Sequence, residues 1–214
     1  MANVNDFDFF LLTPSDFGEV TEILAKEYFT REPLTLGTQP KNIQPAEGRI
    51  GADIRKCLES GASMGLRHRP TGELVGVSAC LFESRAETLT PTQPANELTL
   101  FYRMYDEVMK GVEVFEEKEV NKVLSIYMLG VHKDFGGRGF GRKLVELCVA
   151  KGVERGCQKS VVCVTNKFSY KIFAKLGYEV RHCFDLTSLG PDWGVDTSLM
   201  NGNTIVSVMA MRLS

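Results

Sequence analysis

The segment "LGVHKDFGGRGFGRKL", from Leu129 to Leu144, constrains the fold and function of this chain more than any other stretch. It places four glycines between an apolar, strand-like run and an amphipathic, helix-like run. Glycine loses much conformational entropy on folding, so a plain connector rarely carries so many. Such loops let backbone N–H groups approach a ligand, and at a helix N-terminus that ligand is often a phosphate. We therefore predict a phosphate-binding loop, with a glycine-rich turn without ligand as the alternative.

Two familiar phosphate loops fit this segment poorly. A Walker-type loop ends in Gly-Lys followed by Ser or Thr, whereas this loop ends "FGRKL". A dinucleotide-binding loop has the spacing GxGxxG. Gly137 and Gly139 meet that spacing, but the third position is Arg142, and the next predicted strand, "VVCVTN", ends without the expected acidic residue.

Hydrophobic periodicity and turn signals predict the other elements. Strands are expected at 8–13, 63–84 (a hairpin about a Pro-Thr-Gly turn), 122–131, 159–164, 178–186 and 203–213. Helices are expected from Thr13 or Ser15 to Phe29, and at 46–60, 97–116, 140–155 and 165–177, with loops at 31–37 and 84–97. This order predicts a single mixed α/β domain over residues 1–214.

Composition excludes several classes of function. The chain is 43% hydrophobic and 24% charged, its formal net charge is −2, and it has no basic tail, so we expect no nucleic-acid partner. No apolar run approaches a membrane span. Six scattered cysteines without a CxxC pair indicate reduced thiols rather than a metal site. No basic segment precedes the first apolar residues, so we expect no signal peptide and a cytoplasmic location. We also expect a metal-free monomer.

A third kind of phosphate loop fits better. In GCN5-related N-acetyltransferases (the GNAT superfamily) an Arg or Gln followed by Gly-x-Gly-x-Gly or Ala lies between a strand and a helix. Gly137, Gly139 and Gly141 match that spacing. The segment "TNKFSYKIFAKLGY" resembles the superfamily's second cofactor motif, in which an Asn begins a helix that ends in a Lys-Leu-Gly turn. The chain therefore resembles the superfamily from about Leu124 to Tyr178.

This resemblance implies the fold and the co-substrate. It implies a mixed, mostly antiparallel central sheet flanked by helices, with acetyl-CoA as co-substrate. Its pyrophosphate would be held by backbone N–H groups of the loop. The strand before the loop would splay from its neighbour and expose N–H groups near Leu129 and Val131. Gly136 stands where the superfamily usually has Arg or Gln. The implied cofactor contacts are Met128, Leu129, Gly130, Val131, Gly136, Gly137, Arg138, Gly139, Phe140, Gly141, Arg142, Asn166 and Ser169.

A narrower resemblance lies near the N-terminus. "REPL", Arg31 to Leu34, is similar to a "DEPL"-like motif of insect-type arylalkylamine (dopamine) N-acetyltransferases. The resemblance implies that Glu32 is the general base and takes a proton from the substrate amine through water. Glu27 is the nearest competing carboxylate, and a helix cap or surface carboxylate is the structural alternative for Glu32.

The residue that protonates the departing thiolate is less evident. Many superfamily members use a Tyr in the last helix, and Phe173 occupies that position here. The arylalkylamine branch instead has two serines near the helix start. Ser169 matches one and Thr165 replaces the other, so we expect Ser169 to contact the thiol and Thr165 to play a lesser role. Tyr170 is an alternative donor, and both hydroxyls are candidates for helix N-caps.

The leading hypothesis is an enzyme that transfers an acetyl group from acetyl-CoA to the primary amine of an arylalkylamine such as dopamine, tyramine, octopamine, serotonin or tryptamine. Aromatic residues in "LTLFYRMY" and "VEVF" are candidates for lining its pocket. Alternatives are a polyamine or agmatine acetyltransferase, which needs a more acidic pocket, and a protein N-terminal or lysine acetyltransferase, which needs an open groove. A non-catalytic acyl-CoA-binding module is the alternative outside enzymes.

Overall fold

A mixed seven-stranded sheet forms the centre of the structure, a computed structural model that describes residues 4–40, 43–86 and 99–213. The strands are β1 (Phe7–Leu11), β2 (Met64–His68), β3 (Glu73–Ser84), β4 (Lys122–Val131), β5 (Lys159–Val164), β6 (Glu179–Asp185) and β7 (Ile205–Arg212). Their spatial order is β1-β2-β3-β4-β5-β7-β6. Neighbouring strands are antiparallel except β4 and β5, which are parallel. This confirms the predicted mixed, mostly antiparallel sheet.

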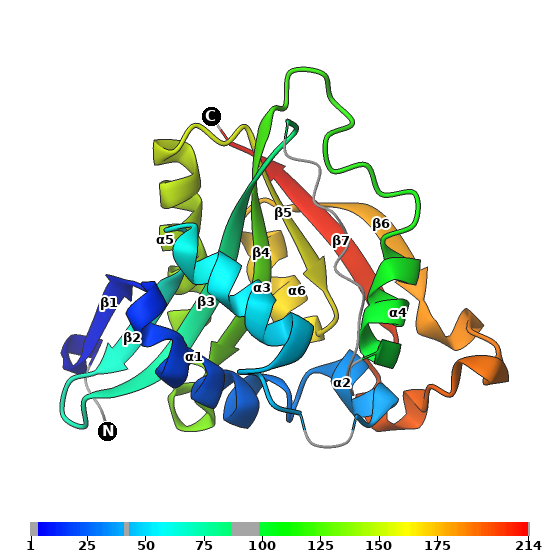
Figure 1. Ribbon diagram of the computed structural model, residues 1–214, viewed down its shortest axis with the longest axis horizontal. Coiled ribbons are helices and arrows are strands. Elements are labelled where there is room, and N and C mark those ends of the chain that lie inside the picture. Colours follow the sequence, from blue (N-terminus) through cyan, green and yellow to red (C-terminus); the bar gives the residue numbers. More distant parts are fainter. Residues whose placement is uncertain (1–3, 41–42, 87–98, 214) are drawn as a thin grey trace.

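Helices cover both faces of the sheet (Figure 1). They are α1 (Phe17–Ile23), α2 (Pro33–Thr38), α3 (Gly48–Glu59), α4 (Thr99–Val108), α5 (Phe140–Glu154) and α6 (Lys167–Lys175). A π-helical turn, Leu24–Tyr28, extends α1. Helices α1 and α3 pack on one face, and α5 and α6 pack on the other. Helix α5 also supplies the crossover that a parallel pair of strands requires.

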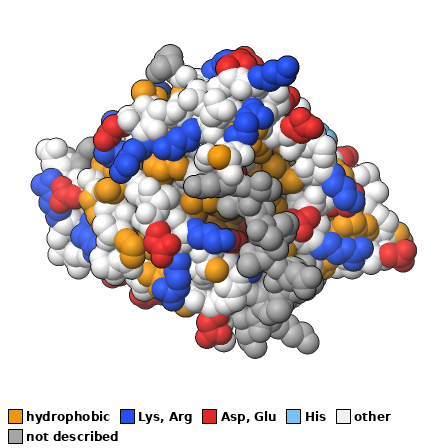
Figure 2. Space-filling view, turned by 45° about the horizontal axis from the view of Figure 1, so that its top comes forward, with side chains coloured by type: hydrophobic (Ala, Val, Ile, Leu, Met, Phe, Trp, Pro, Cys, Tyr) orange, Lys and Arg blue, Asp and Glu red, His pale blue; other side chains and the backbone are white. Residues whose placement is uncertain are grey.

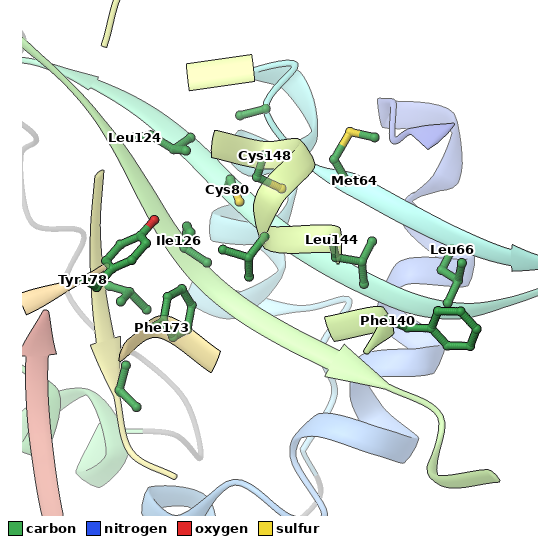
Figure 3. Close-up of a cluster of buried hydrophobic side chains, with 14 of the residues drawn as sticks. Met64, Leu66, Cys80, Leu124, Ile126, Phe140, Leu144, Cys148, Phe173 and Tyr178 are labelled. Atoms are coloured by element: carbon green, nitrogen blue, oxygen red, sulfur yellow. The ribbon is translucent and has the colours of Figure 1, made fainter. Parts of the chain in front are cut away.

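The core beneath α5 and α6 is continuous (Figure 3). Leu144 and Cys148 of α5 and Phe173 of α6 lie with strand residues such as Leu124 in this cluster. Tyr178 belongs to it as well, and its buried hydroxyl is 2.6 Å from the Ser160 hydroxyl. The Phe173 ring is therefore a core group, 1% exposed, and is packed edge-on against Tyr178.

Two further clusters hold the elements around the opposite face. One joins α1, α3 and Tyr102 of α4 to β3 and β4. The other joins Leu34 of α2 and Met104 of α4 to β5, β7 and the connection between β6 and β7. In that connection, the Asp196 N–H donates to the Gly37 carbonyl (2.9 Å), and a Cβ placed on Gly37 would overlap the Met200 side chain. The short helix α2 is thus held against the segment that precedes β7.

Two predictions differ from the structure, one in the extent of a helix and one in the type of element. The helix expected over 97–116 ends at Val108, because Gly111 takes a positive φ of 77° and Arg85 binds the carbonyls of Phe115, Glu117 and Val120. The segment 31–37 was expected to be a loop, but Pro33 begins helix α2. Proline suits the first helical position, whose N–H has no intrahelical acceptor. The loop expected over 84–97 lies mostly outside the described residues.

No helix within the described residues combines the length and apolar character needed to cross a bilayer. Basic and acidic side chains are interspersed over the face shown in Figure 2. This distribution agrees with the small formal net charge of −2.

The packing of α5 gives a stability prediction. Leu144 is fully buried between α5 and the sheet, so Leu144→Ala should lower the free energy of unfolding by about 2–5 kcal/mol, as large-to-small core substitutions do. Urea denaturation measures the change. Val153 lies on the same helix but is 44% exposed, and Val153→Ala should change stability by no more than about 0.5 kcal/mol. Equal effects of the two substitutions would contradict this placement of α5.

Candidate active site

Strands β4 and β5 part in the middle of the sheet. Their pairing runs from Val123–Lys159 to Ile126–Val162, while β4 continues along β3 as far as Val131. The His132 N–H donates to the Val75 carbonyl (2.8 Å), so it points toward β3. Backbone groups alternate along a strand, so the N–H groups of Leu129 and Val131 point to the other, open edge. This edge provides two hydrogen-bond donors that no neighbouring strand covers in the described structure.

The open edge leads directly into the glycine loop. Gly137 and Gly139 adopt positive φ angles of 75° and 80°, which glycine tolerates best. A Cβ on either residue would meet no described heavy atom within 4 Å, so this side of the loop is open. Helix α5 begins at Phe140, and its first N–H groups and its dipole face the same space. The loop therefore has the shape and polarity of an anion cradle.

Side chains of the loop contribute less than its backbone. The Phe140 ring is buried against Phe7 and Phe9. Arg142 is exposed and pairs with Glu146 (2.8 Å), and the Arg138 guanidinium donates to the Asp134 carbonyl (3.4 Å). Gly136 and Gly141 lie beside these residues, and Gly141 comes close to Ile172 of α6. Met128 and Gly130 are buried on β4.

Helix α6 begins beside the parted strands. Its N-cap is Asn166, whose side-chain oxygen accepts from the Phe168 N–H (2.8 Å). The Ser169 hydroxyl is half-buried and donates to the Asn166 carbonyl (2.8 Å). Thr165 precedes the cap, so it is not itself the N-cap of α6. Tyr170 is 39% exposed.

Glu32 is the N-cap of α2 and is 5% exposed. Its carboxylate accepts hydrogen bonds from the Leu34 N–H (3.0 Å), the Thr35 N–H (2.6 Å) and the Thr35 hydroxyl (2.7 Å). The structural alternative from the sequence, a helix cap, is thus realised, but in a buried setting. Burial raises the pKa of Glu32 above its usual value, and hydrogen bonds from Thr35 and Thr165 oppose that rise.

Glu32 and Thr165 meet at a cavity of about 150 Å³. Its walls come from the end of the α1 turn, α2, α3, α4 and the parted strands. The aromatic side chains among them are Tyr28, Phe29, Phe101, Tyr102, Tyr105 and Tyr127. Thus the segment "LTLFYRMY" does line a pocket, whereas the "VEVF" residues Val112, Val114 and Phe115 pack against the third core cluster. The cavity opens on the residues where β4 and β5 part, since Met128, Ile126 and Cys163 also line it.

Sequence patterns did not predict several of the residues that line the cavity. Asp53, Arg49 and Lys56 come from α3, a helix predicted only for its apolar face. Tyr127 lines the cavity because the register between β3 and β4 shifts there, with Ala79 paired to Met128 and Cys80 paired to Ile126. A bulge of this kind re-aims a side chain, and hydrophobic alternation does not reveal it.

Glu27 lies elsewhere. Its buried carboxylate accepts from Arg31 (2.8 Å) and from the Lys133 N–H (3.0 Å), and it lies 3.5 Å from the His132 ring. Arg31 also donates to the Val131 carbonyl (3.0 Å). Glu27 therefore ties the end of the first helix to the start of the glycine loop. It lines a separate surface depression rather than the aromatic cavity.

Among the described residues, no group of three or more His, Cys, Asp or Glu side chains is arranged to hold a metal ion.

Comparison with known proteins places these features in a family. The sequence model of the Acetyltransferase (GNAT) family matches residues 63–178. An acetyltransferase of Yersinia enterocolitica is 41% identical over 59 residues, which are 27% of this chain and 42% of that protein. The match thus spans about two fifths of the length of this curated relative.

Solved structures share the whole fold. Arylalkylamine N-acetyltransferase 2 from Aedes aegypti aligns with a TM-score of 0.84 at 18% identity, over 98% of this chain and 100% of that one. A polyamine N-acetyltransferase from Drosophila melanogaster, which forms N-acetylagmatine, aligns with a TM-score of 0.81 at 18% identity, over 97% and 100%. Naa50 from Arabidopsis thaliana, in complex with a CoA-containing bisubstrate analogue, aligns with a TM-score of 0.58 at 11% identity, over 97% and 99%. At these identities the likeness establishes the fold.

The contacts of Glu27 give a second prediction. Glu27→Ala should lower the free energy of unfolding by about 1–3 kcal/mol, because it leaves the Lys133 N–H and the Arg31 guanidinium without their buried acceptor. Chemical denaturation measures the loss. Glu22 is exposed and pairs with the equally exposed Lys26, so Glu22→Ala should cost less than about 1 kcal/mol. A Glu27 variant as stable as the Glu22 variant would show that this link is unimportant.

Proposed function

The chain belongs to the acetyltransferase (GNAT) family, and we propose that it transfers an acetyl group from acetyl-CoA to the primary amine of an arylalkylamine. The observation that carries the proposal is that a buried carboxylate, an aromatic cavity and the parted strands lie together. A buried carboxylate, Glu32, lines an aromatic cavity, and that cavity opens where β4 and β5 part. We propose a cytoplasmic location, which rests on the sequence alone.

The co-substrate fits the described residues. The open side of Gly137 and Gly139 and the first N–H groups of α5 would hold a pyrophosphate. The N–H groups of Leu129 and Val131 on the open edge would bind the pantetheine amides and the thioester carbonyl. Asn166 and Ser169 would flank the same groove from α6. Acetyl-CoA supplies the activated acetyl group, and CoA-containing ligands are bound by structural neighbours such as Naa50.

The reaction joins the amine nitrogen to the acetyl carbon and breaks the carbon–sulfur bond of the thioester. The amine must first lose a proton, and we assign that proton to the Glu32 carboxylate, reached through water. Burial raises the pKa of Glu32, which makes its carboxylate a stronger base than an exposed one. The thiolate that leaves takes up a proton, for which Ser169 and, secondarily, Thr165 are the proposed donors.

The cavity favours an aromatic amine. Its six aromatic residues form an apolar wall, and its volume of about 150 Å³ is that of a cavity able to hold a benzene-sized ring. A diamine would need extra negative charge to balance its second cation. The two carboxylates of the wall, Glu32 and Asp53, are matched by Arg49 and Lys56, so the wall offers no such excess. Acetylation of a polyamine or agmatine is the alternative, since a structural neighbour forms N-acetylagmatine.

The role of Glu32 predicts a pH effect. Because the amine proton goes to the ionised carboxylate, kcat/KM should rise with pH through the pKa of Glu32, above the ordinary carboxyl value. Glu32→Gln should lower kcat by about 10²–10⁴-fold and abolish this acidic limb while acetyl-CoA binding stays normal. A thiol-release assay with tyramine across pH, together with calorimetric titration of acetyl-CoA, measures both quantities. A Glu32→Gln enzyme with normal kcat and pH profile would remove Glu32 from the mechanism.

The glycine loop predicts a separate effect on binding. Gly139→Val should abolish acetyl-CoA binding, because a branched side chain at a φ of 80° distorts the loop and projects into its open side. Gly156→Val is the matched control, since Gly156 follows the far end of α5 with a φ of 73° and similarly open surroundings. Calorimetric titration of both folded variants tests the loop. Normal binding by Gly139→Val would contradict it.

One outcome separates an enzyme from a binding module. A protein that binds acetyl-CoA but acetylates no member of an amine panel would be the non-catalytic module.

A further inference from the structure

Asp53 is a second carboxylate on the cavity wall, and the proposed reaction does not use it. It lies on α3, whereas Glu32 begins α2. Its side chain is 18% exposed, and burial raises its pKa above the usual value. A carboxylate that is withdrawn from water in a ligand cavity, and that the proposed reaction does not use, is a candidate recognition group.

The neighbours of Asp53 leave its carboxylate able to accept another hydrogen bond. The Tyr102 hydroxyl donates to Oδ2 at 3.3 Å, and Arg49 Nε lies 3.9 Å from the same oxygen. Charge-assisted hydrogen bonds to carboxylates are ordinarily 2.5–2.9 Å long, so both contacts are loose. An ionised carboxylate accepts about four hydrogen bonds. A donor that enters the cavity can therefore bind Asp53 without displacing either neighbour.

The surroundings of Asp53 suit a neutral donor. The Arg49 guanidinium lies 3.9 Å from the centroid of the Tyr102 ring and, with Lys56, supplies positive charge to this end of the wall. Both cations act on Asp53 and lower its pKa, so they already offset its charge. A second ammonium group would meet these cations as well as the carboxylate. A hydroxyl on an aromatic ring would gain the hydrogen bond without that repulsion.

Aromatic residues adjoin both carboxylates. The Glu32 N–H donates to the Tyr28 carbonyl (2.9 Å), and the Tyr28 side chain lines the same cavity as Tyr102, which donates to Asp53. A substrate whose amine lies at Glu32 would therefore run along Tyr28 toward Tyr102 and Asp53. A phenylethylamine places its amine and its ring hydroxyls at opposite ends, as this arrangement requires.

We propose that Asp53 accepts the hydroxyl group on the ring of the amine and makes the enzyme prefer phenolic and catecholic arylalkylamines to unsubstituted ones. This inference rests on the proposed function, and it assigns substrate preference to α3. Asp53 is in this view a specificity residue, distinct from Glu32 at the reacting end.

The test compares tyramine with β-phenylethylamine, which differ only in the ring hydroxyl. The wild-type enzyme should acetylate tyramine with a kcat/KM about tenfold higher, or more. Asp53→Leu introduces an apolar side chain of similar size and removes the acceptor, and it should bring the ratio close to one by reducing turnover of tyramine alone. Glu59→Gln, at an exposed position of the same helix, is the matched control and should keep the wild-type ratio.

A second variant tests the preference for tyramine with the Asp53 carboxylate still in place. Tyr102→Phe takes away the competing hydroxyl and leaves Asp53 in place, so the preference for tyramine should be kept or increased. A ratio that stays at the wild-type value in Asp53→Leu overturns the proposal. Should Tyr102→Phe lose the preference while Asp53→Leu keeps it, Tyr102 rather than Asp53 would be the recognition group, which also overturns it.

Other outcomes distinguish the inference from the proposed function. A wild-type enzyme that acetylates both amines equally well refutes the role of Asp53 but keeps the arylalkylamine assignment. If Asp53→Leu instead loses activity toward putrescine or agmatine alone, Asp53 binds a second ammonium group and the proposal is wrong. A wild-type protein that acetylates no arylalkylamine at all refutes the proposed function itself.

Discussion

The parting of β4 and β5 is the constraint on which the rest of the structure depends. A parallel pair that stayed together to its ends would satisfy the N–H groups of Leu129 and Val131 and would close the cavity. Because the pairing stops at Ile126 and Val162, one strand edge stays available and a gap forms between the two halves of the sheet. The glycine loop at the end of β4 and the start of α6 then border this gap, so both predicted cofactor motifs reach one groove.

Glu32 has a structural role in addition to the chemical role that we propose for it. Its carboxylate caps α2 through the N–H groups of Leu34 and Thr35, which fixes its position, and burial keeps it poorly solvated. The two influences on its pKa oppose each other, since hydrogen bonds favour the charged form and desolvation disfavours it. The proposed base is therefore held rigidly and tuned by the same short segment.

Sequence patterns predicted the regular parts of this fold well. The bounds of β4 and β5 follow from apolar runs, which depend on only a few neighbouring residues. The N-cap of α6 is Asn166, the residue that the family resemblance placed at the start of this helix, whereas capping patterns alone suggested Thr165 or Ser169. The cavity wall depends on contacts between residues far apart in the sequence, so sequence patterns did not predict which residues line it. Tyr127 enters the cavity through a bulge, and Asp53 meets Tyr102 across α3 and α4. Helix α2 was missed because Pro33 indicates the end of a helix as readily as its start.

The contact between Gly37 and Met200 separates two properties of the site. It anchors α2, and with it Glu32, to the connection between β6 and β7, whereas Asp53 is carried by α3 on the sheet. Changes in that C-terminal connection would shift the proposed base with little effect on the proposed recognition of the ring. Changes on α3 would alter the proposed recognition of the ring with little effect on the position of Glu32. We therefore expect divergence among homologues to adjust turnover and substrate choice along two independent routes.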